Sequence, residues 1–234
     1  MKHLLKQELS GWKRWEVAWL IVACLIITGL SIYWGDNLMG IISATTGVAC
    51  VVCTGKGKLS AYLFGLINCV LYAIISYQAK LYGETMLNGT YYVIMQFYGA
   101  YVWSKNINEE TCEVKKRHMA NKERLALLLS IIIGTMLYGF VLKSLGDAMP
   151  FVDSFTTVSS VIAMFISVKM FAEQWWIWIL VNTFSVYMWA CDISAGSYNW
   201  ATLLMWCTYL LNAILMCYKW EKEARLNKGS EQNV

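Results

Sequence analysis

The sequence predicts an all-α integral membrane protein with eight transmembrane helices. Of its 234 residues, 58% are hydrophobic, 15% are charged and only one is proline, whereas soluble domains average about 25% charged residues. The apolar residues also form long unbroken runs, as helices that cross the hydrocarbon core require. We place the eight spans at residues 16–34, 38–54, 59–78, 86–103, 125–142, 152–170, 174–191 and 200–218.

The first span follows a basic tail, so it could be a retained helix or a signal peptide. No small-x-small cleavage site follows it, and Trp34-Gly-Asp-Asn37 leads directly into the second span. A retained helix is therefore the better interpretation. We assign residues 1–37 to an N-terminal tail and one extra transmembrane helix.

The placement of Lys and Arg predicts the orientation in the bilayer. With the N-terminus inside, all of the 19 Lys and Arg residues except Lys80 and Lys143 fall on the cytoplasmic side. Both termini are then cytoplasmic, which an even number of spans requires. The net charge of +4 reflects this bias, so it indicates a lipid bilayer and not a nucleic-acid partner.

Nothing in the predicted spans indicates catalysis, a cofactor or a metal ion. Seven of the eight cysteines lie in apolar spans, where they are best interpreted as small core residues. Gly55-Lys-Gly-Lys58 lacks the spacing and the strand–helix setting of a phosphate-binding loop. The spans contain no nucleophile–base pair, metal-ligand cluster or paired carboxylates, so we do not expect an enzyme.

The segments on either side of the one long polar connection, a charged loop at residues 105–124, resemble each other. Ser43-Ala-Thr-Thr46 opens a three-helix unit before this loop, and Ser154-Phe-Thr-Thr157 opens one after it. Further matched pairs are Asn68 with Asn182, Tyr92 with Tyr209, and Trp103 with Trp220. The sequence therefore predicts an internal duplication.

This duplication predicts a core of three plus one plus three helices behind the extra N-terminal helix. The first repeat covers residues 38–104 and the second 151–220, with a linker helix at 125–150 and a tail at 221–234. Three spans are an odd number, so the linker helix is needed to give both repeats the same orientation. Parallel repeats of this kind are a transporter architecture, with the substrate site near the midplane between the halves.

The seventh span, WWIWILVNTFSVYMWACD at residues 175–192, carries aromatic and amide side chains on one face. Trp175, Trp178, Asn182 and Trp189 share that face at the helical repeat. A buried amide needs hydrogen-bond partners, because unsatisfied polar groups are costly in hydrocarbon. Each amide could bond a neighbouring helix, worth about 0.6–2 kcal/mol, or it could bind a solute.

The number of such side chains favours a binding pocket. Asn68, Gln96, Asn182 and Asn212 lie well inside spans, Asn88 lies near the outer end of one, and Tyr92, Trp178 and Tyr209 lie at similar depths. Several amides with several large aromatics suit a flat, hydrogen-bonding solute. Tryptophans near span ends are instead expected to be interfacial anchors; these are Trp15, Trp103 and Trp220.

The middle of every predicted span lacks Asp, Glu, His, Lys and Arg. Ion-coupled carriers usually place such a group in the membrane, so facilitated diffusion is favoured over active pumping. A phosphorylated solute would need Arg or Lys in its site. A neutral solute, or one with a delocalised positive charge, suits tryptophan and tyrosine faces.

At Trp175-x-x-Trp178-x-x-x-Asn182 the sequence resembles the PnuC family of bacterial vitamin transporters, whose motif has this W-x-x-W-x-x-x-N form. The similarity extends over about residues 15–222 and includes the Tyr98-Gly99…Trp103 ending of the first repeat. The resemblance implies a nicotinamide riboside carrier in the bacterial inner membrane. It also implies a trimer and a duplicated three-helix core similar to SWEET sugar transporters.

The resemblance further implies facilitated diffusion that a cytoplasmic kinase makes one-way by phosphorylating the riboside. By position, Trp175, Trp178 and Asn182 would line the site, with Asn68 as their counterpart in the first repeat. Ala61 and Phe64 stand where the first repeat would carry tryptophans, so we expect an asymmetric pocket. The alternatives are a carrier of thiamine or riboflavin, and a membrane receptor or scaffold whose amides only pack helices.

Overall fold

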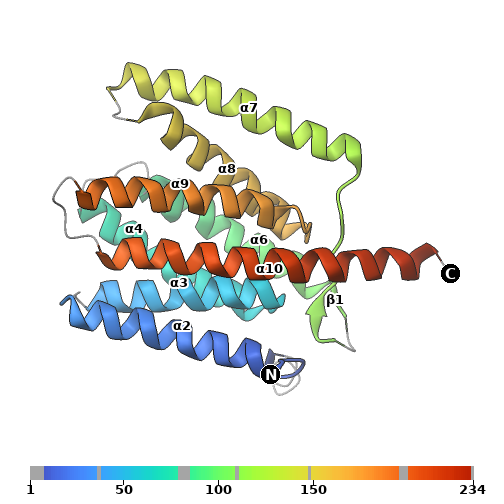
Figure 1. Ribbon diagram of the computed structural model, residues 1–234. Helices are drawn as coiled ribbons and strands as arrows, with labels where there is room; N and C mark the ends of the chain where they lie inside the picture. Colours follow the sequence, from blue (N-terminus) through green and yellow to red (C-terminus); the bar gives the residue numbers. More distant parts are fainter. Residues whose placement is uncertain are drawn as a thin grey trace. The chain divides into compact units, whose positions relative to one another are not determined.

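The structure is a computed structural model that describes residues 8–35, 38–78, 85–108, 111–146, 149–194 and 200–232. Within these residues the fold is helical apart from one short hairpin (Figure 1). The helices are α2 (Arg14–Tyr33), α3 (Leu38–Lys56), α4 (Ser60–Gln78), the π-helix η1 (Leu87–Tyr92) running into α6 (Val93–Ser104), α7 (Asn121–Ser144), α8 (Pro150–Val168), α9 (Gln174–Ser194) and α10 (Trp200–Gln232). The strands are β1 (Ile107–Asn108) and β2 (Glu113–Val114).

The helices begin and end close to the predicted spans, and the all-α prediction is confirmed. Five of them are long and apolar enough to cross a bilayer: Arg14–Tyr33, Leu38–Lys56, Asn121–Ser144, Pro150–Val168 and Leu203–Asn227. The full count of eight spans stays a prediction. The main difference in length is at α10, which continues to Gln232, well past the end of the predicted eighth span.

The chain divides into two compact units. Unit 1 contains residues 1–115 together with 200–212, and unit 2 contains residues 116–199 together with 213–234. Helix α10 thus contributes its first part to unit 1 and its remainder to unit 2.

Unit 1 is built on α3, which packs against α2 and α4, while α4 also packs against η1 and α6. An apolar cluster lies between α2 and α3, with Ala23, Ile27 and Val48 almost fully buried and Trp19 and Tyr209 packed around them. Small residues inside a span let helices approach closely, which is how packing stabilises helix pairs in lipid.

Unit 2 packs α7 on α8 and α8 on α9 (Figure 1). Its buried cluster is Ala163, Ile166, Phe171, Ile177 and Val181, with Trp178 packed against it. Helix α7 buries only Gly139 among its residues, where a Cβ would collide with the ring of Phe151. The other faces of α7 are apolar and exposed, as expected of a helix surrounded by lipid.

The helices that open the two predicted repeats end in the same way. Gly57, after α3, has φ +81°, and Met170, after α8, has φ +61°. In both turns the backbone N–H of the next residue reaches the carbonyl five positions back; these bonds are Lys58 N to Cys53 O at 3.0 Å and Phe171 N to Ile166 O at 3.1 Å. Both are helix ends of the Schellman type, so the sequence similarity extends to local backbone geometry.

The charged loop, which the sequence describes only as a polar connection, is folded. Strands β1 and β2 pair antiparallel, and the N–H of Val114 donates to the carbonyl of Gly57 at 3.2 Å in unit 1. In unit 2 the N–H of Arg117 donates to the carbonyl of Met170 at 3.1 Å. Within each unit, therefore, the loop is hydrogen-bonded to the positive-φ turn that follows the first helix of the repeat, α3 in unit 1 and α8 in unit 2.

The expectation that Trp103 and Trp220 are interfacial anchors is wrong. Both indoles are fully buried. The Trp103 ring packs edge-on to Tyr62, with centroids 5.0 Å apart, and the Trp220 ring packs edge-on to Trp175 at 5.8 Å. The Lys116 ammonium of the folded loop lies 5.4 Å from the centroid of the Trp220 ring. Trp15 is 45% exposed, as an interfacial residue would be.

Candidate functional site

Helix α9 brings three of the predicted site residues together in unit 2. Trp175 and Asn182 are 3% and 4% exposed, and Trp178 is half-buried against the apolar cluster of α8 and α9. Their spacing places them on one face of the helix. Trp189, which continues this stripe, lies outside the described side chains.

Asn182 is a buried residue of α9. Among the residues that the structure describes, none forms a hydrogen bond with it. The indole N–H of Trp175, about two turns away along α9, has no acceptor within the described ranges. An unsatisfied buried polar group costs about 1–3 kcal/mol, and among the described residues this cost applies to the Trp175 indole N–H. The indole and the Asn182 amide give this face of α9 polar groups that can bond a solute.

In unit 1 two predicted residues converge on a glycine. Asn68 of α4 donates from Nδ2 to the Ser43 carbonyl at 2.8 Å and to the Ser43 hydroxyl at 3.3 Å. A Cβ on Gly47 would lie 2.9 Å from Asn68 Nδ2 and would collide with the Tyr209 hydroxyl. We call Ser43, Gly47, Asn68 and Tyr209 the Gly47 cluster.

Sequence reasoning missed Gly47 as part of this arrangement. The signal for it is local, because Gly47 follows the Ser43-Ala-Thr-Thr46 motif directly and lies one helical turn after Ser43. The absence of a side chain there lets the amide of Asn68 and the phenol of Tyr209 come close to the α3 backbone. Trp206 packs edge-on to Tyr209, with ring centroids 5.6 Å apart.

Asn212 has a different environment. Its side chain is fully buried, its Nδ2 donates to the Val51 carbonyl at 3.0 Å, and its Oδ1 accepts from the Trp19 indole at 3.1 Å. Both ends of the amide are therefore used to join α10 to α2 and α3. For this residue the structure favours helix packing, the alternative that the sequence left open.

Gln96, Asn88 and Tyr92 lie on η1 and α6. Gln96 is 7% exposed, and its Nε2 lies 3.6 Å from the Cys69 thiol, next in sequence to Asn68. Asn88 is 6% exposed and Tyr92 ends the π-helix. Short π-helical turns are rare and frequently lie at functional sites, so this feature, which the sequence did not predict, adds weight to the two residues.

All nine predicted site residues are uncharged. The buried charged residues of the described ranges lie elsewhere, near helix ends, in turns, in the loop or on the extension of α10: Glu16, Lys56, Lys58, Glu113, Lys116, Glu173 and Lys219. No group of three or more His, Cys, Asp or Glu residues among the described residues could hold a metal ion. The predicted site residues can therefore stack on a solute and form neutral hydrogen bonds with it.

Comparison with known proteins finds a transporter family and relatives that are named as transporters. A family model described as "Nicotinamide mononucleotide transporter" matches residues 37–222. The nicotinamide riboside transporter PnuC of Neisseria mucosa is 37% identical, covering 96% of this chain and 88% of the relative. The protein of the same name from Haemophilus influenzae is 33% identical, covering 93% and 95%.

A solved structure is also similar over nearly the full length. It is the crystal structure of the vitamin B3 transporter PnuC, with a TM-score of 0.84 and 36% sequence identity. The match covers 96% of this chain and 98% of the solved chain. These relatives are named as transporters, which is a non-enzymatic role.

Proposed function

The chain belongs to the PnuC family of membrane transporters, and we propose that it carries nicotinamide riboside across the bacterial inner membrane. Two curated relatives and the family resemblance support this substrate. The observation that carries the proposal is the buried Asn182 amide, which lacks a partner among the described residues and shares a helix face with two tryptophans.

The riboside fits the site better than its mononucleotide. The family model is described by the mononucleotide, but a phosphate group calls for Arg or Lys, and the proposed site residues are amides and aromatics. The pyridinium ring of the riboside carries a delocalised positive charge, which attracts tryptophan faces. The ribose hydroxyls and the carboxamide can exchange hydrogen bonds with asparagine side chains.

We propose the following roles. In unit 2, Trp178 and Trp175 stack on the ring and Asn182 bonds the carboxamide or a hydroxyl. In unit 1, the Gly47 cluster supplies Asn68 and Tyr209, and Gln96, Asn88 and Tyr92 supply further polar groups. Asn212 supports the helix packing around these residues through Trp19 and Val51.

Facilitated diffusion is the proposed mechanism, with both termini in the cytoplasm and a homotrimer as the assembly. The uncharged centre of the predicted spans argues against coupling to protons or sodium. A site that excludes phosphate would also retain the phosphorylated product inside the cell. Phosphorylation by a cytoplasmic kinase would then make net uptake one-way.

Purified protein in liposomes tests the transport mechanism. Labelled nicotinamide riboside should equilibrate across the membrane without a proton or sodium gradient, and it should not rise above the outside concentration when either gradient is imposed. Accumulation driven by a gradient would contradict facilitated diffusion. Binding without any flux would favour the receptor or scaffold.

The second candidate is a carrier of another aromatic vitamin. Thiamine also contains a cationic aromatic ring, so cation–π attraction alone does not separate it from the riboside. Thermal stabilisation of the protein by nicotinamide riboside, its mononucleotide, thiamine and riboflavin should be greatest with the riboside. A larger shift with thiamine or riboflavin would replace the proposed substrate.

A further inference from the structure

Two lysines are buried where α3 ends and turns into α4: Lys56 is the last residue of α3, and Lys58 lies in the turn. The sequence predicts them only as positive charges on the cytoplasmic side, yet Lys56 is 2% exposed and Lys58 is 1% exposed. Burying an ammonium group is unfavourable unless close partners replace its water. Those partners therefore identify which segments must be in place together.

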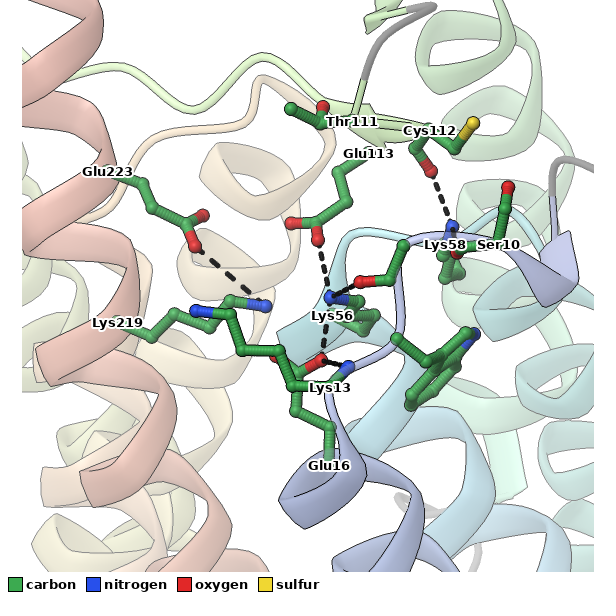
Figure 2. Close-up of polar contacts among 12 residues, drawn as sticks. Ser10, Lys13, Glu16, Lys56, Lys58, Thr111, Cys112, Glu113, Lys219 and Glu223 are labelled. Carbon is green, nitrogen blue, oxygen red and sulfur yellow. Dashed lines mark hydrogen bonds and ion pairs between the residues drawn. The ribbon is translucent and has the colours of Figure 1, made fainter.

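Lys56 joins three segments of unit 1 (Figure 2). Its Nζ lies 2.6 Å from a carboxylate oxygen of Glu16 on α2 and 2.6 Å from one of Glu113 on β2. It also donates to the carbonyl of Gly11 at 2.6 Å. The start of α2, the end of α3 and the hairpin thus share one buried cation.

Lys58 binds the same two flanking segments through backbone carbonyls. Its Nζ donates to Ser10 O at 2.8 Å and to Cys112 O at 2.6 Å (Figure 2). Burial lowers the pKa of Lys58 below its ordinary value, although the nearby Glu8 and Glu113 carboxylates oppose that shift. Little water reaches this ammonium group, so its hydrogen bonds to the protein matter more.

Residues 8–13, which precede α2, therefore lie against the α3–α4 turn, and we call them the strap. Glu8 accepts from the backbone N–H groups of Leu59 and Ser60, each at 3.1 Å, and so caps the N-terminus of α4. Gly11 has φ +76°, and a Cβ there would lie 2.6 Å from the Thr111 carbonyl of the hairpin turn. The strap is held tightly between the turn and the hairpin.

We propose that the strap is a lock on this end of unit 1, which must be released for the solute to leave on the cytoplasmic side. The proposal rests on the proposed function and orientation. While the strap is seated, it fixes together the ends of α3 and α4, the helices that carry Gly47 and Asn68. Release removes partners from both lysines at once, so seated and released are two discrete states.

A reversible tether tests the lock while keeping Lys56, Lys58 and the backbone carbonyls that they bind. The Ser10 and Cys112 carbonyls bind the same Nζ, so a short, cleavable bifunctional thiol reagent can join Ser10→Cys to the native Cys112. The other seven cysteines are replaced, and the same background without Ser10→Cys is the matched control. Tethering should reduce nicotinamide riboside exchange in liposomes to the leak of protein-free vesicles, leave the affinity unchanged, and be reversed by cleaving the tether.

Two results would overturn the lock. One is exchange at the control rate in fully tethered protein. The other is a loss of affinity together with exchange, which would show that the strap only maintains the fold. If the untethered control itself neither binds nor exchanges the riboside, the proposed substrate fails, and the same tether comparison is made with whichever of the other vitamins binds.

Loosening the strap provides the opposite perturbation. Lys58→Met keeps the length of the side chain but removes its bonds to the strap and hairpin, so riboside exchange should become severalfold faster with the affinity unchanged. The backbone N–H groups of Leu59 and Ser60 should also exchange with deuterium faster. Lys13→Met, at an exposed position of the strap, is the control and should behave as wild type. Slower riboside exchange in a folded, binding-competent Lys58→Met protein would overturn the lock.

Discussion

Two asparagines at the residue scale show what a sequence can and cannot reveal about a buried amide. Asn182 and Asn212 both lie inside apolar helices, and the sequence predicted both as site residues. The partners of Asn212 lie 161 and 193 residues away in the chain, so no local pattern distinguishes it from Asn182. Amide positions could be predicted from the sequence, but their hydrogen bonds depend on tertiary packing.

Replacing each asparagine with leucine should separate binding from packing. Asn182→Leu should weaken riboside binding about tenfold or more, the equivalent of about 1.4 kcal/mol, with little change in ligand-free melting temperature. Asn212→Leu should lower that melting temperature, because the Trp19 indole and the Val51 carbonyl lose their partner at a cost of about 1–3 kcal/mol. A ligand-free destabilisation of Asn182→Leu as large as that of Asn212→Leu would assign both amides to packing.

The aromatic part of the motif can be tested with two tryptophans of α9, Trp178 and Trp176. Trp178→Ala should weaken binding by about 1–3 kcal/mol if the ring stacks on the substrate, as aromatic–base stacking does. Trp176 is the control, because it is 58% exposed and its indole N–H donates to Glu221 at 3.1 Å. The riboside affinities of Trp178→Ala and Trp176→Leu show which tryptophan stacks on the substrate. A greater loss in Trp176→Leu would mean that the other face of α9 binds the substrate.

At the scale of elements, hydrophobic run length predicted the helices well and the connections poorly. Lipid demands long apolar helices, so α2, α3, α7 and α8 could be placed from composition alone. The β-hairpin, the buried Lys56 and Lys58 and the burial of Trp103 and Trp220 depend on bonds between distant segments. Charge placement assigns such lysines only to the cytoplasmic side, because it contains no information about their partners.

The close approach of helices at the Gly47 cluster gives an element-scale prediction. Gly47→Ala places a methyl group against the Tyr209 hydroxyl and the Asn68 amide, and overpacking of this kind costs about 1–3 kcal/mol. Both melting temperature and riboside affinity should fall. Tyr209→Phe in the same protein removes the colliding hydroxyl and should recover part of the melting temperature.

Gly29→Ala is the matched control, because a Cβ at that position of α2 meets nothing within 4 Å. Alanine is favoured over glycine inside a helix by about 0.5–1 kcal/mol, so this variant should melt at the wild-type temperature or slightly higher. If Gly29→Ala and Gly47→Ala lower the melting temperature equally, the loss does not come from the contact with Tyr209 and Asn68.

At the scale of the whole molecule, the duplicated pattern has a physical counterpart within each unit. Both repeat helices α3 and α8 end in the same positive-φ turn, and each turn accepts a hydrogen bond from the charged loop. Each unit also buries a tryptophan that packs edge-on to an aromatic ring. Trp103 packs on Tyr62, near the start of α4, and Trp220 packs on Trp175, near the start of α9. These matches are local, so the parallel three-plus-one-plus-three layout rests on the membrane topology.

Topology is therefore the whole-molecule prediction with most consequences, and single cysteines in a cysteine-free background can test it. Lys115 and Ser144 are both exposed and flank α7, so a membrane-crossing α7 must place them on opposite sides. Charge bias puts Lys115 on the cytoplasmic side.

A membrane-impermeant thiol reagent applied to intact cells should label Ser144→Cys at once and Lys115→Cys only after permeabilisation. Three further spans return the chain to the cytoplasm, so Lys222→Cys should behave like Lys115→Cys. If all three cysteines are labelled from the same side, α7 does not cross the membrane. The two repeats would then not have the same orientation.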